Sequence, residues 1–235
     1  RWGHSGQYGT DFLVPGMAVE IVDNHTLEAY ARRIVAKVER FNKEYSAVTF
    51  TEPLPENIRP GHLIAADEPG PDVHISGCRM SGNRARGLLI GSRGRVIIEN
   101  NYFHIAGASI LFEGDGNFWF EQSGVRDVTI RNNIFANGNY GSRGWGSACI
   151  AVGSGISQRQ TSRYHRNIQV DGNLFRVFDP RIVNLYCVDG FQFSASNRIV
   201  RTSDYPATFD PKLHFVFDQC DHIEIPRQIE MAEQR

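Results

Sequence analysis

The chain has 235 residues, enough for one large domain or two small ones and for a sizeable core. Its formal net charge is −1, so nothing in its charge indicates binding to nucleic acid or to an anionic membrane surface. No stretch reaches the ~18 apolar residues of a membrane-spanning helix, and we expect neither a nucleic acid nor a membrane as a partner.

Residues 12 to about 68 contain two predicted strands. The stretch PGMAVEIVD (Pro15–Asp23) alternates like a strand, and YSAVTFTEPLP (Tyr45–Pro55) is typical of a strand that ends in a proline-bounded turn. Between them, apolar side chains at near-helical spacing predict an amphipathic helix: Leu27, Tyr30, Ile34, Val38 and Phe41. A long strand is the alternative, because positions 34, 36 and 38 also share one face of an extended chain.

From residue 73 onward the chain repeats one phrase. VIIENNYF (Val96–Phe103) is nearly VTIRNNIF (Val128–Phe135), and looser copies are VHISGCRM (Val73–Met80), IQVDGNLF (Ile168–Phe175) and FQFSASNRIV from Phe191. The central residues of the first four copies are Ile75, Ile98, Ile130 and Val170. Successive copies lie 23, 32, 40 and 23 residues apart, and a basic period near 23 with insertions is typical of a solenoid.

Each repeat also has a second short apolar run, and no helical pattern separates the runs. These runs are GLLIGS (Gly87–Ser92), ASILFEG (Ala108–Gly114), SACIAVGS (Ser147–Ser154) and RIVNLYCV (Arg181–Val188). A turn of about 23 residues with two or three short strands predicts an all-β fold, the parallel β-helix. HFVFDQCDHIEI (His214–Ile225) is interpreted as the last coil, and the polar tail after Pro226 as its cover.

Three asparagines recur at the corner after the first strand: Asn101, Asn133 and Asn173. We expect positive φ there, which asparagine tolerates better than most residues. We also expect each side-chain amide to bond its equivalents in the coils above and below. Ligand binding by these asparagines is the less favoured interpretation.

Function in a solenoid is expected on loops that interrupt the repeat. FEGDGNFWFEQSG (Phe112–Gly124) places three acids, Glu113, Asp115 and Glu121, beside Asn117 and Trp119. Aromatic rings can stack on sugars while carboxylates accept bonds from hydroxyl groups, and a pair of carboxylates is what glycoside hydrolysis requires. The alternative is that the rings cap the core and the acids pair with Arg126 or Arg131.

A second insertion, ANGNYGSRGWGSA (Ala136–Ala148), presents Tyr140, Arg143 and Trp145 among glycines, and we interpret it as a lid or sugar platform, or else an irregular turn. SGNRARG (Ser81–Gly87) places Arg84 and Arg86 at a corner, to bind sugar hydroxyls or to fix nearby acids.

The remaining titratable residues indicate no special chemistry. His104 and His165 are interpreted as ordinary surface histidines, and no spacing indicates a metal site or a cofactor. The four cysteines form no CxxC pair and are interpreted as small buried core residues. The chain starts at Arg1 without a signal-like segment, and we interpret it as a processed or excised fragment.

The segments NRARG, IENNYF and NFWFEQSGVRDVTIRNN within Asn83–Phe135 resemble the right-handed β-helix glycosidases of the exo-α-1,3-galactosidase type. The resemblance covers about Pro15 to Ile225. It implies a right-handed parallel β-helix with a small β-barrel insertion, which makes residues 12–68 that insertion. The implied division is residues 1–11 as the end of an upstream coil, 12–68 as the barrel-like insertion, 69–225 as the coils and 226–235 as a C-terminal tail.

The same resemblance implies an inverting hydrolase that releases terminal galactose from glycans outside the cell, in a secreted or periplasmic location. Similar proteins carry an Asp-Asp pair before the barrel, and only Asp11 precedes it here, so part of the catalytic machinery is expected to be missing. Glu113, Asp115 and Glu121 are carried over as catalytic candidates. Asn117, Trp119, Arg86, Trp145 and Tyr140 are carried over as substrate-binding candidates. A non-catalytic glycan-binding β-helix and a polysaccharide lyase are the alternatives.

Overall fold

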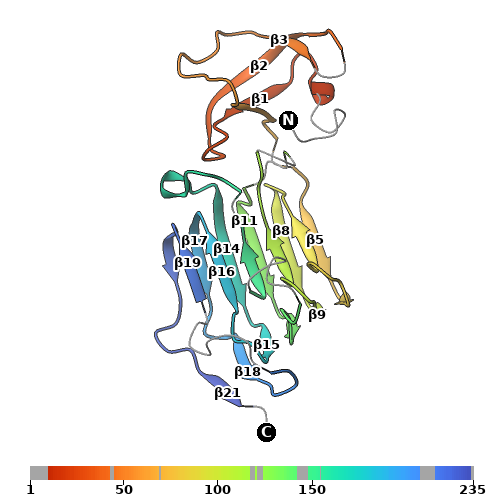
Figure 1. The fold of residues 1–235 in the computed structure, drawn as a ribbon, viewed down its shortest axis with the longest axis vertical. Helices are drawn as coiled ribbons and strands as arrows, with labels where there is room; N and C mark the ends of the chain where they lie inside the picture. The colour runs from red at the N-terminus through yellow and green to blue at the C-terminus, as the bar shows by residue number, and fades with distance from the viewer. Residues whose placement is uncertain are drawn as a thin grey trace. The chain divides into compact units, whose positions relative to one another are not determined.

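The computed structural model describes residues 10–42, 45–68, 70–116, 120, 124–141, 148–153, 155–206 and 215–233 (Figure 1). The chain forms two compact units. The first contains residues 1–69 together with the segments 114–122 and 155–162, and the second contains the remainder. The described residues form strands and two 3₁₀ turns, Thr10–Phe12 and Arg159–Thr161.

The first unit is built on a four-stranded antiparallel sheet in the order β3-β2-β1-β4. Its strands are β1 (Ala18–Val22), β2 (Ala29–Arg40), β3 (Ser46–Phe50) and β4 (Leu63–Ala66). Strand β2 pairs with β1 through its first half and with β3 through its second half. Leu13, Val19 and Val35 are the buried centre of this unit.

The helix predicted around Ile34 is wrong, and the alternative of a long strand is confirmed as β2. Pairing on both sides supplies the backbone hydrogen bonds of β2, and Val35 points into the core formed with β1. Those contacts arise from residues distant in sequence and outweigh the weak local preference for a helix.

Two loops that arise between coils belong to the first unit. His25 Nδ1 lies 2.9 Å from Ser157 Oγ, and Ser162 Oγ donates a hydrogen bond to Thr26 O at 2.6 Å. Gly116 faces Leu27 and Leu63, where an added Cβ would come within 2.6 Å of both side chains. These contacts place Gly116, Ser157 and Ser162 beside residues of the four-stranded sheet and of the turn between β1 and β2.

The second unit consists of parallel strands stacked in three sheets. Sheet 1 contains β5 (Val73–Ser76), β8 (Arg95–Glu99), β11 (Asp127–Arg131), β14 (His165–Asp171), β17 (Val188–Phe193) and β20 (Asp221–Glu224). Sheet 2 contains β6 (Arg79–Ser81), β9 (Tyr102–His104), β12 (Ile134–Ala136), β15 (Leu174–Val177), β18 (Arg198–Arg201) and β21 (Met231–Glu233). Sheet 3 contains β7 (Leu88–Ile90), β10 (Ile110–Phe112), β13 (Ile150–Val152), β16 (Val183–Tyr186) and β19 (Phe215–Asp218).

Among the described residues, five successive coils each contribute one strand to each sheet, and β20 and β21 follow them, which is the predicted parallel β-helix. Figure 1 shows β5, β8, β11, β14 and β17 side by side, running from yellow to blue. The central residues aligned from sequence are true partners: Ile75 pairs with Ile98, Ile98 with Ile130, and Ile130 with Val170. The tail after Pro226 is itself partly a strand, since β21 pairs with β18.

Identical side chains form continuous columns inside the β-helix. Phe103, Phe135 and Phe175 are fully buried, with stacked rings whose centroids are 5.2 and 4.6 Å apart. Apolar residues before and after them, from β5 to β20, complete the core. Burial of each such ring removes a large apolar area from water, and ring stacking adds about 1 kcal/mol per pair.

The asparagine ladder predicted from the repeat is confirmed, but the predicted backbone conformation is wrong. Asn133 Nδ2 donates to Asn173 Oδ1 at 2.9 Å, and Asn101 Nδ2 donates to Asn133 Oδ1 at 3.1 Å. Positive φ angles fall one residue earlier, at Gly77, Asn100, Asn132 and Gly172. The preceding residue makes the turn, which leaves the ladder asparagine free to point inward.

Two of the four cysteines match the expected burial, and none forms a disulfide. Cys149 and Cys187 are buried, and Cys220 is half-buried. Cys78 is exposed, so its interpretation as a core residue is wrong. It follows β5, which pairs only with β8 among the described strands and therefore has neighbours on one side alone.

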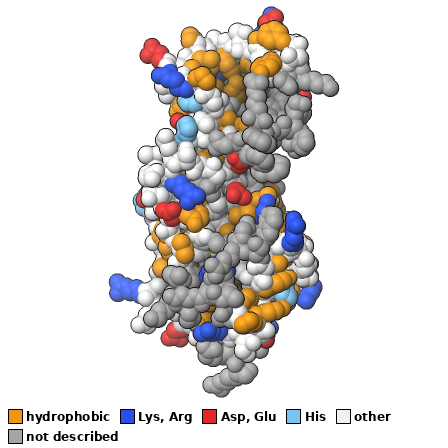
Figure 2. Space-filling view, in the orientation of Figure 1, with side chains coloured by type: hydrophobic (Ala, Val, Ile, Leu, Met, Phe, Trp, Pro, Cys, Tyr) orange, Lys and Arg blue, Asp and Glu red, His pale blue; other side chains and the backbone are white. Residues whose placement is uncertain are grey.

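Acidic and basic side chains are interspersed on the face drawn in Figure 2. Within the described ranges, no helix has the length and apolar character needed to cross a bilayer.

His165 is fully buried at the start of β14, so its interpretation as a surface histidine is wrong. Its Nε2 lies 3.1 Å from Gly153 O, and its ring packs against Tyr164 at 4.1 Å. Burial lowers the pKa of His165 from 6.5 to about 4, against a smaller opposite effect of the bond to Gly153. The ring is therefore neutral at pH 7.

We expect His165 to make the protein less stable in mild acid. Between pH 6.5 and 4 the unfolded chain binds a proton that the folded chain does not, so the free energy of unfolding falls as the pH falls. The full effect is about 3 kcal/mol. Urea denaturation at pH 7 and pH 4.5 should show a smaller loss for His165→Gln than for the unsubstituted chain. Equal losses would contradict the assignment.

Candidate functional site

Glu113 is the first residue after β10 and lies on the turn that leads from sheet 3 to sheet 1. Its half-buried side chain extends over the next coil, where Gly153 follows β13. A Cβ on Gly153 would meet Glu113 Oε1 at 3.1 Å, so the glycine provides the space for the carboxylate. The Gly153 carbonyl accepts from Tyr164 Oη at 3.1 Å, which fixes the backbone beside Glu113.

Asp115 is half-buried and belongs to the segment 114–122 of the first unit, whereas Glu113 belongs to the second unit. Gly155 lies beside Asp115: its amide donates to Gly114 O at 3.3 Å. An added Cβ on Gly155 would lie 3.6 Å from Asp115 Oδ1. Each acid is therefore accompanied by a glycine: Glu113 by Gly153, and Asp115 by Gly155. The catalytic role of either carboxylate stays a prediction.

The structure describes some of the remaining candidate residues and not others. Asn117, Trp119, Glu121 and Trp145 lie outside the described residues. Arg86 is half-buried on the turn between β6 and β7, where its carbonyl accepts from Asn83 Nδ2 at 3.2 Å.

Tyr140 is 39% exposed on the turn after β12. Its ring stacks on Tyr205 with centroids 5.9 Å apart and meets His104 edge-on at 5.0 Å. Two exposed, parallel tyrosine rings are a suitable surface for the apolar face of a sugar. Arg86 and Tyr140 follow sheet 2 and Glu113 follows sheet 3, so these candidates occupy two different corners of the coil.

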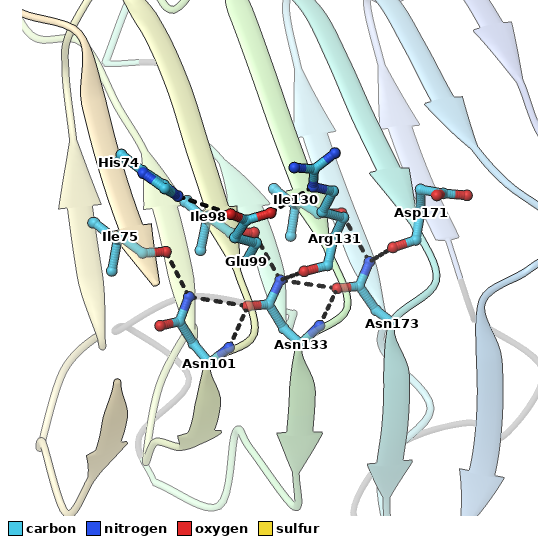
Figure 3. Close-up of polar contacts among 10 residues, drawn as sticks. All are labelled: His74, Ile75, Ile98, Glu99, Asn101, Ile130, Arg131, Asn133, Asp171 and Asn173. Carbon is cyan, nitrogen blue, oxygen red and sulfur yellow. Dashed lines mark hydrogen bonds and ion pairs between the residues drawn. The ribbon is translucent and has the colours of Figure 1, made fainter. Parts of the chain in front are cut away.

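A polar row that sequence reasoning missed runs across the ends of the sheet 1 strands (Figure 3). His74 Nε2 lies 2.8 Å from Glu99 Oε1, and Arg131 Nε donates to Glu99 Oε2 at 2.6 Å. Asp171, opposite Arg131 on β14, accepts from Ser196 Oγ at 2.6 Å. Arg131 therefore pairs with Glu99.

The electrostatics of this row favour ionised carboxylates. Hydrogen bonds from Arg131, and then from His74, hold the pKa of Glu99 below its usual value. Hydrogen bonds from Ser196 and Ser194 do the same for the pKa of Asp171. The described residues include no group of three or more His, Cys, Asp or Glu side chains placed to hold a metal ion.

Beside the row, the solvent face of sheet 1 forms an open groove of about 490 Å³. Thr129, Gln169, Gln192 and Glu224 line it from four successive strands. The first three occupy the position just before the central residue of each repeat, so aligning the repeats at that position would have revealed the polar face. A search confined to insertions could not reveal it.

Comparisons with known proteins agree with the fold. The model of the GLAA-B β-barrel domain II family matches residues 1–64, which confirms a β-barrel unit near the N-terminus. Alpha-1,3-galactosidase A of Shewanella woodyi is 38% identical over 204 residues, which are 86% of this chain and 33% of that protein. Alpha-1,3-galactosidase B of Bacteroides thetaiotaomicron is 33% identical over 219 residues, 92% of this chain and 35% of that protein.

A more distant relative, alpha-1,3-galactosidase B of Akkermansia muciniphila, is 28% identical over 228 residues, 96% of this chain and 28% of that protein. The chain thus spans about one third of the length of the curated relatives that it matches. The predicted resemblance is confirmed: across most of its residues this chain is similar to α-1,3-galactosidases, and the chain itself contains parallel β-helix coils and a match to the GLAA-B β-barrel domain II.

Proposed function

We propose that this protein is a glycoside hydrolase that releases terminal α-linked galactose from glycans. The proposal rests on similarity to α-1,3-galactosidases over 86–96% of the chain. Because the chain spans about a third of those relatives, we propose that part of the catalytic machinery lies outside these 235 residues. A glycan substrate also accords with a secreted or periplasmic location, which we propose and which cell fractionation would test.

The proposed reaction is an inverting hydrolysis that uses two carboxyl groups. A protonated carboxyl donates its proton to the glycosidic oxygen as the bond between that oxygen and the anomeric carbon breaks. A carboxylate accepts a proton from water, whose oxygen bonds the anomeric carbon from the opposite face. This geometry needs the two carboxyl groups roughly 6.5–9.5 Å apart.

Glu113, Asp115 and Glu121 are the residues of this chain proposed to supply or support those carboxyl groups. Glu113 is supported by its place at a coil corner, where Gly153 of the next coil leaves room for its carboxylate. Tyr140 and Arg86 are proposed to contact more distant parts of the glycan from the adjoining corner. Asn117, Trp119 and Trp145 complete the proposed substrate contacts.

Galactose release tests the proposal directly. The 235-residue chain, and any longer protein that contains it, would be incubated with an α-1,3-galactoside and followed by proton NMR. Initial appearance of β-galactose is expected from the longer protein. Binding of the substrate without release would favour a non-catalytic glycan-binding β-helix. An unsaturated product would instead identify a lyase, and initial α-galactose would contradict inversion.

Glu113→Gln is expected to lower the rate of galactose release about 100-fold, because the amide can neither donate nor accept the catalytic proton. The measurement is kcat/KM in the protein that shows activity. Asp127→Asn, an exposed substitution on β11, is the matched control and should leave the rate within about twofold. An unchanged rate in Glu113→Gln would remove Glu113 from the catalytic machinery.

A further inference from the structure

The groove on sheet 1 is distinct from the proposed catalytic corner. Glu113 lies on the turn that leads toward the start of β11, whereas the groove lies along β11, β14, β17 and β20 and includes the ends of these strands. Arg131 and Asp171 are the last residues of their strands, and both line the groove. The proposed catalytic role of Glu113 therefore does not account for the polar lining of the groove.

Four polar side chains cross the groove in register. Thr129 pairs with Gln169, Gln169 with Gln192, and Gln192 with Glu224. Neighbouring strands lie about 4.8 Å apart, so these side chains present hydroxyl, amide and carboxylate groups at that interval. The interval is close to the length of one sugar ring, so each strand can meet one unit of an extended oligosaccharide.

Hydrogen bonds hold several of these side chains in place before any ligand binds. Gln192 Nε2 donates to Glu224 Oε2 at 3.1 Å, and Ser196 Oγ holds Asp171 while accepting from Gly172 N at 2.8 Å. Glu99 holds Arg131 by Nε, which directs the remainder of the guanidinium outward from the ladder (Figure 3). Side chains ordered before binding lose less conformational entropy when a ligand arrives.

The charges of the groove indicate a neutral ligand. Among the described residues, its lining contains one cation, Arg131, which already pairs with Glu99, and two carboxylates, Asp171 and Glu224. A phosphate, sulfate or uronate would meet two like charges. The hydroxyl groups of a neutral sugar would instead donate to the carboxylates and exchange bonds with the glutamine amides.

From this geometry we propose that the groove is a binding site for a neutral oligosaccharide, separate from the corner at Glu113. The oligosaccharide lies across the strands, with successive sugars over β11, β14, β17 and β20. Such a site would hold a branched or repetitive glycan while another part of the same molecule is processed elsewhere. The proposal does not depend on the chain having hydrolase activity.

Isothermal titration calorimetry of the 235-residue chain tests this site. The probe is a neutral galacto-oligosaccharide of about four units, one for each strand, and a uronate oligosaccharide of equal length is the comparison. We expect the neutral probe to bind and the anionic probe to bind more weakly. No binding of the neutral probe, or tighter binding of the anionic one, would overturn the proposal.

Two matched variants locate the site. Asp171→Asn keeps an oxygen to accept from Ser196 but loses the carboxylate, and it should weaken binding about tenfold. Asp127→Asn is the same change on the same sheet face outside the groove lining, and it should change affinity less than about twofold. Glu113→Gln should also leave this affinity unchanged. Equal effects of the two aspartate substitutions, or loss of binding in Glu113→Gln alone, would overturn the groove site without bearing on galactose release.

Discussion

Replacing Asn133 with alanine is expected to lower the free energy of unfolding by about 4 kcal/mol, since several buried hydrogen bonds are lost at once. The Asn133 side chain accepts from Asn101 N at 2.9 Å and from Asn101 Nδ2 at 3.1 Å. It donates to Ile98 O, Arg131 O and Asn173 Oδ1 at 2.9, 3.0 and 2.9 Å. Alanine removes all of these bonds and leaves the buried Asn101 amide without its side-chain acceptor, and the desolvation cost of that unpaired donor adds to the loss of the bonds.

The neighbouring asparagine provides the control. Asn132 is exposed and has φ of 55°, so its role is to turn the backbone. Asn132→Gly should change stability by less than about 0.5 kcal/mol, because glycine adopts this conformation readily. Urea denaturation followed by circular dichroism measures both variants. Similar midpoints for Asn133→Ala and the unsubstituted chain would show that the ladder is dispensable.

Phe135→Ala is expected to cost about 4 kcal/mol, through lost burial and through the cavity left between two rings. The Phe135 ring is fully buried between Phe103 and Phe175, almost parallel to each at 13° and 6°. Backbone pairing of β12 with β9 and β15 holds the coils at a fixed spacing, so the neighbouring rings cannot close the gap. The midpoint of thermal unfolding should fall by roughly 10 °C.

Ile134, the preceding residue on β12, is 39% exposed and faces outward. Ile134→Ala should therefore cost less than about 1 kcal/mol in the same thermal measurement. The contrast within one strand separates core packing from a general effect on β propensity. If both substitutions lowered the midpoint equally, the column of rings would not be the source of the stability.

The repeat made most of the β-helix predictable, because each strand has the same neighbours and so the same requirements. Alignment of Ile75, Ile98, Ile130 and Val170 gave the correct register of sheet 1. Local sequence patterns predicted the structure less well where the contacts of a residue do not recur from coil to coil. The local sequence does not indicate that strands on both sides hold Val35 extended, or that His165 is buried where β14 begins.

The candidate site was less predictable, for a physical reason. A loop's residue types indicate which chemistry is available, but the corner of the coil that each loop occupies depends on the strand that precedes it. Glu113 and Tyr140 follow strands of different sheets, which their shared presence in insertions did not reveal. The groove is lined by residues in regular strand positions, such as Gln169. Their common polar character is visible only when equivalent positions of neighbouring strands are compared.

The unequal distances between copies of the repeat leave the pairing of Ile75, Ile98, Ile130 and Val170 intact, although 23, 32 and 40 residues separate them. The strands on either side of the extra residues stay in register with the neighbouring coils. Doubling the length of a flexible loop costs only about 0.6 kcal/mol of closure entropy. The segments that project from the corners can therefore be lengthened, shortened or exchanged during evolution while the pairing of the strands stays the same.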